Sequence, residues 1–205
     1  MTVSFDVYDF KDIQKVCSPV VSTTEEDLRR AYLNYICLTV SEIEKTCTAY
    51  GCNGYMASRI TVPCKIEGEA PKHILFSPVK VIPKTRRVTV EPVTVGEEHS
   101  VRFIFYNECD LRLGEVVQTV IDSEPIDYAD MFKRTDKAVC ERCGPDGRYR
   151  IAVNPKYLLN ILNGMKDAKS VLLYFGDATQ AMRIYPRGYD GCENTDAFLL
   201  PVRIF

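Results

Sequence analysis

The side chains that could carry catalytic chemistry are sparse in this sequence of 205 residues. It contains no G-x-S-x-G, H-E-x-x-H, G-x-G-x-x-G or Walker phosphate-binding motif. The two histidines, His73 and His99, both fall in segments that favour strands, where a histidine is more often a half-buried surface residue than a base. No serine or cysteine is spaced so as to pair with either histidine. We therefore expect a protein that is not an enzyme and that needs no cofactor.

The nine cysteines could instead hold a metal or form a disulfide framework. Cys140 and Cys143 have the spacing of half a zinc knuckle, but a second pair is missing. Cys109 and Cys192 could complete four ligands only if the fold brought them close, so we predict two ordinary loop thiols and no metal. The count is odd, and most cysteines stand singly in apolar or alternating segments. This pattern favours the reduced thiols of a cytoplasmic protein.

The overall composition is that of an ordinary globular protein. Lysine and arginine number 26, aspartate and glutamate number 28, and hydrophobic residues make up 46% of the chain. The net charge of −2 excludes a generally basic, DNA-coating protein but permits a local basic face. No apolar run approaches the roughly 18 residues of a membrane span, and the acidic N-terminal segment lacks the apolar stretch of a signal peptide.

The elements that must position any site follow one pattern at both ends of the chain, where the apolar period changes from two to about 3.6 and back. Residues 1–65 predict a helix at 10–17 capped by Asp9, with strands at 3–8, 31–40, 44–50 and 55–64. Residues 147–205 predict a helix that begins at Pro155 with Asn154 as its N-cap, and strands at 148–153, 170–176, 180–185 and 197–204. Each segment is therefore expected to be a β-α-β-β-β unit.

The middle of the chain differs from both ends. Residues 66–125 are repeatedly interrupted by proline and show no helical period, which predicts strands at about 73–82, 86–95, 100–107 and 112–121. Residues 126–147 are charged and irregular. We predict an α+β fold of curved antiparallel sheets with two helices on one face. One domain is expected over 1–130 and a C-terminal unit over 131–205.

Three segments resemble the bacterial DNA polymerase sliding clamp, the β subunit that tethers the replicative polymerase to DNA. IAVNPKYLLNILNGMK and AFLLPVRIF are similar to its last repeat, which ends in an aliphatic-Pro-aliphatic-Arg-aliphatic tail. AYLNYICLTV and GCNGYMASRITVP resemble the first repeat of its middle domain, and residues 121–128 resemble the Pro-Asp-Tyr segment that ends that domain. The family carries three domains, so this chain resembles a short, divergent member with a DNA-clamp-like fold. Whether residues 66–147 are a degenerate repeat or an insertion stays open.

The resemblance implies a surface that faces DNA. In sliding clamps the helices line the ring and face DNA phosphates, and lysine attracts phosphate without reading bases. Lys11 and Lys15 share one face of the first predicted helix. Lys156 lies on a polar stripe of the second helix that contains no carboxylate, and Lys166 follows that helix. An ordinary solvated helix face is the alternative.

The resemblance also implies a hydrophobic groove that takes short linear peptides from polymerases and other replication proteins. In the family, a turn and the C-terminal tail meet to form it. The matching positions here are Leu33, Gly54, Tyr55, Met56, Ala57, Phe198, Leu200, Pro201, Val202 and Arg203. The family's His-Arg is replaced by Tyr55-Met56, so the peptide preference should differ. The alternative is that these residues simply form the core at a sheet edge.

The function implied is a sliding-clamp-like polymerase processivity or partner-tethering factor in DNA replication, which binds double-stranded DNA without sequence specificity. A ring of this family contains six domains, so about three copies of this chain would be needed. Two alternatives stay open. One is a stand-alone clamp-fold peptide-binding module that does not encircle DNA, and the other is an unrelated α+β protein whose C-terminus matches by chance.

Overall fold

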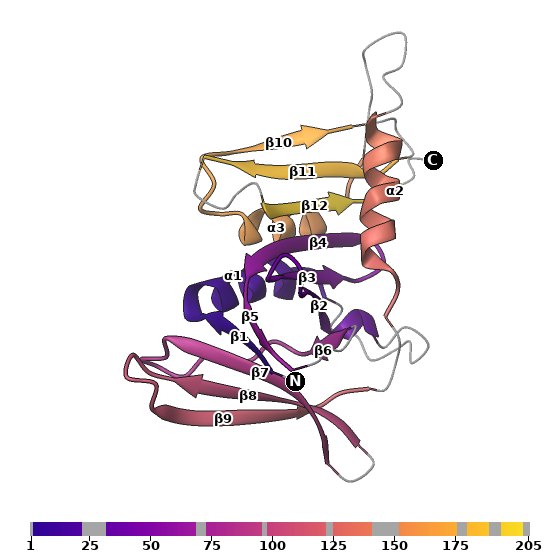
Figure 1. Cartoon of the computed structure of the whole chain (residues 1–205). Coiled ribbons are helices and arrows are strands. Elements are labelled where there is room, and N and C mark those ends of the chain that lie inside the picture. Colours follow the sequence, from indigo (N-terminus) through magenta and orange to yellow (C-terminus); the bar gives the residue numbers. More distant parts are fainter. Residues whose placement is uncertain are drawn as a thin grey trace.

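The computed structural model describes residues 2–21, 32–68, 73–95, 98–121, 125–140, 152–175, 180–188 and 194–202, and within them two antiparallel sheets (Figure 1). Sheet A has the order β5-β1-β7-β8-β9, from β1 (Thr2–Asp6), β5 (Lys65–Glu67), β7 (Arg87–Val95), β8 (Glu98–Tyr106) and β9 (Arg112–Thr119). Sheet B has the order β10-β11-β12-β4-β3-β2-β6. Its strands are β2 (Ile36–Ser41), β3 (Thr46–Cys52), β4 (Met56–Pro63), β6 (Ile74–Phe76), β10 (Ser170–Tyr174), β11 (Met182–Arg187) and β12 (Thr195–Leu199).

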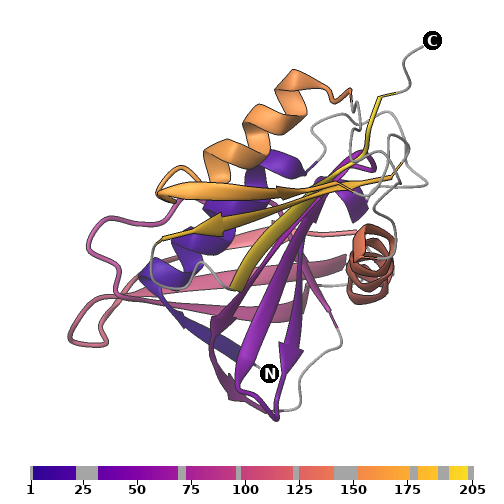
Figure 2. The same ribbon diagram turned by 90° about the horizontal axis from the view of Figure 1, so that it is seen from above.

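The described residues also form α1 (Val7–Cys17), a 3₁₀ turn η1 (Ser18–Val20), α2 (Tyr128–Cys140) and α3 (Pro155–Gly164). Figure 2 shows α1 and α3 on one face of sheet B and α2 on the opposite face. The predicted α+β fold with two helices on one face is therefore confirmed, and a third helix is added to it.

The helix starts follow the chemistry of their caps. The Asn154 side chain accepts a hydrogen bond from the Lys156 N–H, and Pro155 occupies the first turn, as predicted. The prediction that Asp9 caps α1 is wrong. Asp6 caps it instead, because its carboxylate accepts a hydrogen bond from the Tyr8 N–H at 2.8 Å. Asp9 lies in the first turn of the helix.

The main core lies between α1 and the two sheets. Phe10 of α1 is fully buried among Phe5, Phe76 and Phe103, with ring centroids 5.9 to 6.1 Å apart. The end of α1 also approaches β3 closely, because a Cβ at Gly51 would lie 2.5 Å from the carbonyl oxygen of Cys17. Glycine is required there by contact, since real Cβ atoms do not come that close.

Segments far apart in the sequence meet in sheet B, where β12 pairs antiparallel with β4. Phe198 stands opposite Ala57, and Leu199 stands opposite Met56. The N-terminal unit is divided, because β1 leaves β2–β4 and pairs with β5 and β7 in sheet A. In the C-terminal unit, residues 152–154 form no strand, and the rest of the predicted strand at 148–153 lies outside the described residues.

The middle of the chain contains both confirmed and wrong predictions. β7, β8 and β9 match the strands predicted at 86–95, 100–107 and 112–121. Within the range predicted as a strand at 73–82, only the three residues of β6 form one. The strand predicted at 31–40 begins at Ile36, as β2. The interpretation of 126–147 as irregular is wrong, because α2 begins at Tyr128. Tyr128, Met131, Phe132 and Thr135 lie at i, i+3, i+4 and i+7, a helical stripe that the intervening charges conceal.

Candidate protein-binding and DNA-facing surfaces

The hairpin between β3 and β4 forms around Asn53-Gly54. Gly54 has a φ of +86°, and the Asn53 side-chain oxygen accepts hydrogen bonds from the backbone N–H groups of Tyr55 and Met56, both at 3.1 Å. The side chain of Leu33 lies beside Gly54, since its Cδ1 would be 3.8 Å from a Cβ placed there. Gly54 thus supplies the positive φ of this hairpin, and Asn53 is not among the described residues with positive φ.

The tail after β12 lies against this turn. The Leu200 N–H donates a hydrogen bond to the Tyr55 carbonyl at 3.0 Å, and the Val202 N–H donates to the Ala152 carbonyl at 2.7 Å. The turn and the tail, 145 residues apart at these two partners, therefore lie together as the resemblance implied. Arg203 lies outside the described residues.

Burial divides the residues predicted to bind peptide. Tyr55, Leu200 and Val202 are 60%, 41% and 50% exposed, whereas Leu33, Met56, Ala57 and Phe198 are buried. Successive side chains of a strand point to opposite faces of a sheet. Met56 consequently packs with Leu199 under α3, while Ala57 and Phe198 face α2.

Helix α2 covers the face of sheet B that carries Ala57 and Phe198. The Phe132 ring meets the Phe198 ring edge to face at 5.2 Å, and Tyr128 stacks on Tyr50 at 5.2 Å. Burial raises the pKa of Tyr128 well above its ordinary value, so its hydroxyl stays protonated. The sequence did not predict this cover, because residues 126–147 show no clear helical pattern.

Two arginines share one buried carboxylate beneath α2. Arg183 is 1% exposed and forms an ion pair with Asp196, which also accepts a hydrogen bond from Arg59 Nε at 2.6 Å. The Arg183 guanidinium also donates to the Tyr185 hydroxyl at 3.0 Å and 3.2 Å. Both guanidinium groups lie over the Phe132 ring, at 4.6 Å and 5.1 Å from its centroid. A buried charge needs such partners, since an unpaired one would be costly.

The helix face that carries the predicted DNA-facing lysines has both signs of charge. Lys11, Lys156 and Lys166 are exposed, but Lys15 forms an ion pair with Asp167. The hydrogen bond and positive charge of Lys15 lower the pKa of Asp167, which keeps that carboxylate ionised.

The ends of α1 and α3 lie close together at this face. A Cβ at Gly164 would be 3.1 Å from the Lys15 carbonyl oxygen. A cavity of about 230 Å³ lies beside this contact, and Asp9, Asp12, Lys15 and Asp167 are among its lining residues. Four charges therefore gather where the helices meet, and three of them are carboxylates.

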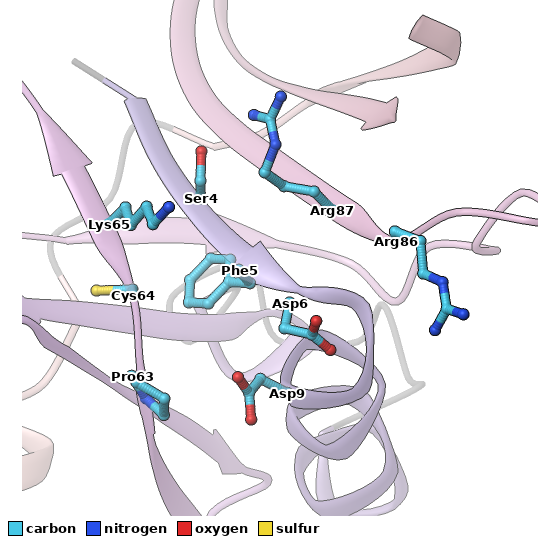
Figure 3. Close-up of a pocket in the computed structure, with 9 residues that line it drawn as sticks. All are labelled: Ser4, Phe5, Asp6, Asp9, Pro63, Cys64, Lys65, Arg86 and Arg87. Atoms are coloured by element: carbon cyan, nitrogen blue, oxygen red, sulfur yellow. The ribbon is translucent and has the colours of Figure 1, made fainter. Parts of the chain in front are cut away.

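A second cavity, of about 350 Å³, lies between β1, β5 and the start of β7 (Figure 3). Asp6 and Asp9 stand on its α1 side, Lys65 and Arg87 extend from β5 and β7, and Arg86 lies immediately before β7. Asp6 already caps α1, and Arg87 donates hydrogen bonds to Asp110. This cavity contains none of the residues predicted to bind peptide or DNA.

One cysteine and one histidine do come together, although no spacing in the sequence predicted it. The Cys37 sulfur lies 3.9 Å from His73 Nδ1. Burial raises the pKa of Cys37 to about 12, so the thiol stays protonated and is a poor nucleophile. Cys17 and Cys47 are buried as well, and burial raises their pKa values too.

The described residues contain no group of three or more histidine, cysteine, aspartate or glutamate side chains placed to hold a metal ion. Cys143, Cys192 and the Cys140 side chain lie outside them, so the prediction for the Cys140–Cys143 pair stays a prediction. Within the same part of the chain, every helix is too short or too polar to cross a membrane.

Comparisons with known proteins find matches by structure but not by sequence. No protein-family model matches the chain, and a search of curated proteins finds no significant match. Solved structures do match. A sliding clamp from Caulobacter crescentus is 16% identical with a TM-score of 0.68, and the match covers 99% of this chain and 65% of that one. The chain has the sliding-clamp fold. A clamp from Pseudomonas aeruginosa has 12% identity and a TM-score of 0.67 over 100% of this chain and 67% of that one.

A third clamp structure, the β subunit of Streptococcus pyogenes DNA polymerase, has a TM-score of 0.68 at 11% identity and covers 98% of this chain. Two further clamp structures, from C. crescentus and Streptococcus pneumoniae, are matched over 66% and 65% of their length, so this chain spans less than two thirds of them. Another P. aeruginosa clamp was solved bound to griselimycin. At these identities the comparison shows a shared fold, which confirms the resemblance to sliding clamps at the level of the fold.

Proposed function

We propose that this clamp-fold chain is a cytoplasmic tethering factor in DNA replication that binds short linear peptides of polymerases or other replication proteins and catalyses no reaction itself. The observation that supports the proposal is the hydrogen bond from the Leu200 N–H to the Tyr55 carbonyl. Tyr55, Leu200 and Val202 of this turn and tail all have exposed apolar side chains, and Tyr157 stacks on Tyr55 at 5.7 Å. A cluster of exposed apolar side chains commonly marks a protein-binding site.

We propose further that α1 and α3 face duplex DNA in an assembly of about three copies. Lys11, Lys156 and Lys166 would attract phosphates, while Asp167 neutralises most of the effect of Lys15. Assembly would use sheet edges. Among the described strands, β10 is an edge of sheet B and β9 an edge of sheet A, and both carry exposed apolar side chains, including Tyr174 and Val117. Such edges are templates for pairing with another chain.

A peptide titration tests the proposed binding site. Linear peptides would be selected from a display library on the wild-type chain and measured by fluorescence anisotropy, with dissociation constants expected in the micromolar range, about −8 kcal/mol. Leu200→Asp places a charge among the exposed apolar side chains and should abolish binding while the circular dichroism spectrum stays unchanged. Leu111→Asp is the matched control, because Leu111 is also exposed but precedes β9 in sheet A. Equal binding by Leu200→Asp and the wild type would exclude this site.

A specific observation favours a second candidate, a peptide-binding module of the same fold that does not encircle DNA. Asp9, Asp12 and Asp167 line one cavity with Lys15 where α1 and α3 meet, and Asp167 already pairs with Lys15. Carboxylates repel phosphate, so this face has less attraction for DNA than a purely basic stripe. A chain that stays monomeric but binds the selected peptides would support the module.

A further inference from the structure

The packing of α2 differs in kind from the packing of α1. Phe10 of α1 lies among phenylalanine rings in the main core. Phe132 of α2 instead lies under the guanidinium groups of Arg59 and Arg183 and beside Tyr50 and Phe198. We call the five residues beneath α2 the α2-facing surface: Tyr50, Ala57, Arg59, Arg183 and Phe198.

The α2-facing surface has the composition of a protein interface. Tyrosine and arginine are the residue types that concentrate at the energetic centres of interfaces, where they are packed and shielded from water. Asp196 fixes both arginines in place from the sheet side, so their guanidinium groups are held ready for a ring that approaches from the other side. An arginine above an aromatic ring is a favourable cation–π contact, and here one ring receives two.

The fit of α2 on this surface is incomplete. The Tyr128 hydroxyl is buried without a hydrogen-bond partner among the described atoms. The polar contacts described for residues 127–135 stay inside the helix, such as the Asp130–Arg134 ion pair and the hydrogen bond from the Thr135 hydroxyl to the Met131 carbonyl. In this part of the helix, docking therefore depends on apolar side chains. Tyr128 and Phe132, one turn apart, are buried against sheet B, and Met131 packs against the same cluster.

We propose that the α2-facing surface is a protein-docking surface that α2 occupies in cis, and that a partner segment with two aromatic side chains one helical turn apart replaces α2 there. The proposal rests on the proposed function, because Ala57 and Phe198 adjoin the Tyr55–Leu200 contact and belong to the residues expected to bind peptide. α2 thus controls access to the buried part of that site. The exposed part, at Tyr55 and Leu200, is accessible at all times.

Occupation in cis has a measurable consequence. A surface that is free in only about 1% of molecules binds an external ligand about 100-fold more weakly than a surface that is always free. Removing the Phe132 ring should undock α2 and strengthen binding in trans. Replacing Tyr128 by phenylalanine should have the opposite effect, because it removes the buried unpartnered hydroxyl and keeps the ring that stacks on Tyr50.

The probe is a fluorescein-labelled peptide of residues 125–135 of this chain, PIDYADMFKRT. It would be titrated against the full chain as wild type, Phe132→Ala, Tyr128→Phe and the exposed control Lys133→Ala. We expect Phe132→Ala to bind the probe at least about tenfold more tightly than the wild type. Lys133→Ala should match the wild type, and Tyr128→Phe should bind more weakly. A probe that itself carries Phe132→Ala should not bind any of these chains.

Hydrogen exchange keeps the proposal testable if Phe132→Ala does not fold. Amides of α2 should exchange faster than those of α1 in the wild type and should slow in Tyr128→Phe. Equal probe binding by a folded Phe132→Ala chain and the wild type would overturn the proposal, as would α2 amides that exchange only as slowly as those of α1.

The display-selected peptides separate this proposal from the proposed function. If they bind the wild type and lose binding in Leu200→Asp while Phe132→Ala has no effect on the probe, only the role of α2 is wrong. If the probe behaves as expected and no display-selected peptide depends on Leu200, only the binding site at the turn and tail is wrong.

Discussion

Removal of the Asp196 carboxylate should be one of the most destabilising polar substitutions in this protein. Asp196 joins Arg59 of β4 to Arg183 of β11, so Asp196→Ala leaves the fully buried Arg183 without its ion-pair partner. Breaking one partner of a buried pair costs about 3–5 kcal/mol in the free energy of unfolding. The Tyr185 hydroxyl, which accepts from the same guanidinium, supports the lower end of that range.

Urea unfolding followed by circular dichroism measures this cost, with Asp110→Asn as the control, because asparagine tolerates the φ of +57° at this position better than alanine does. Asp110 also pairs with an arginine, Arg87, but its side chain is 75% exposed, and exposed pairs contribute about 0–1 kcal/mol. A double variant that also replaces Arg183 with Met should recover much of the loss, because the fully buried charge is then gone and the remaining arginine, Arg59, is partly exposed. A loss below about 1 kcal/mol for Asp196→Ala would refute the reasoning, since that is the range of an exposed pair.

Two further predictions concern single groups. Burial, followed by the neighbouring carboxylates of Asp6 and Asp12, raises the pKa of Asp9. The folded state therefore binds the Asp9 proton more tightly than the unfolded state does. As a result, the contribution of Asp9 to the free energy of unfolding falls as the pH rises. Asp9→Asn should therefore raise the urea midpoint at pH 7 and lose this advantage at pH 3; an equal gain at both pH values would contradict the assignment. Burial raises the pKa of Cys37 to about 12, so iodoacetamide at pH 8 should modify the exposed Cys109 in the native protein and leave Cys37 unmodified until urea is added. Mass spectrometry of the peptides checks this, and rapid native labelling of Cys37 would be the opposing result.

Local chemistry explains which elements were predictable from the sequence. The cap at Asn154, the proline after it and the Asn53-Gly54 turn depend on residues next to one another, and the structure has all three. α2 was missed because its apolar stripe is short and interrupted by charged residues. Its helical character becomes clear only when Phe132 is seen to pack against sheet B.

Non-local pairing explains the rest. Arg59 and Asp196 are 137 residues apart and meet only because β12 pairs with β4 in one particular register. The division of the N-terminal unit between two sheets depends likewise on β1 pairing with β7. The turn and the tail were placed together by resemblance to clamps, and neither composition nor periodicity would have done so. The domain boundary at residue 130 stays a prediction.

The mass of the assembly in solution tests the central claim most directly. Light scattering coupled to a sizing column, at tens of micromolar chain, reports that mass without labels or ligands. A clamp-like tethering factor that encircles DNA should elute at about three times the 23.3 kDa of one chain, because three copies supply the clamp-type units of a closed ring. A single species of one chain mass at that concentration would contradict encirclement of DNA and leave the peptide-binding module as the function.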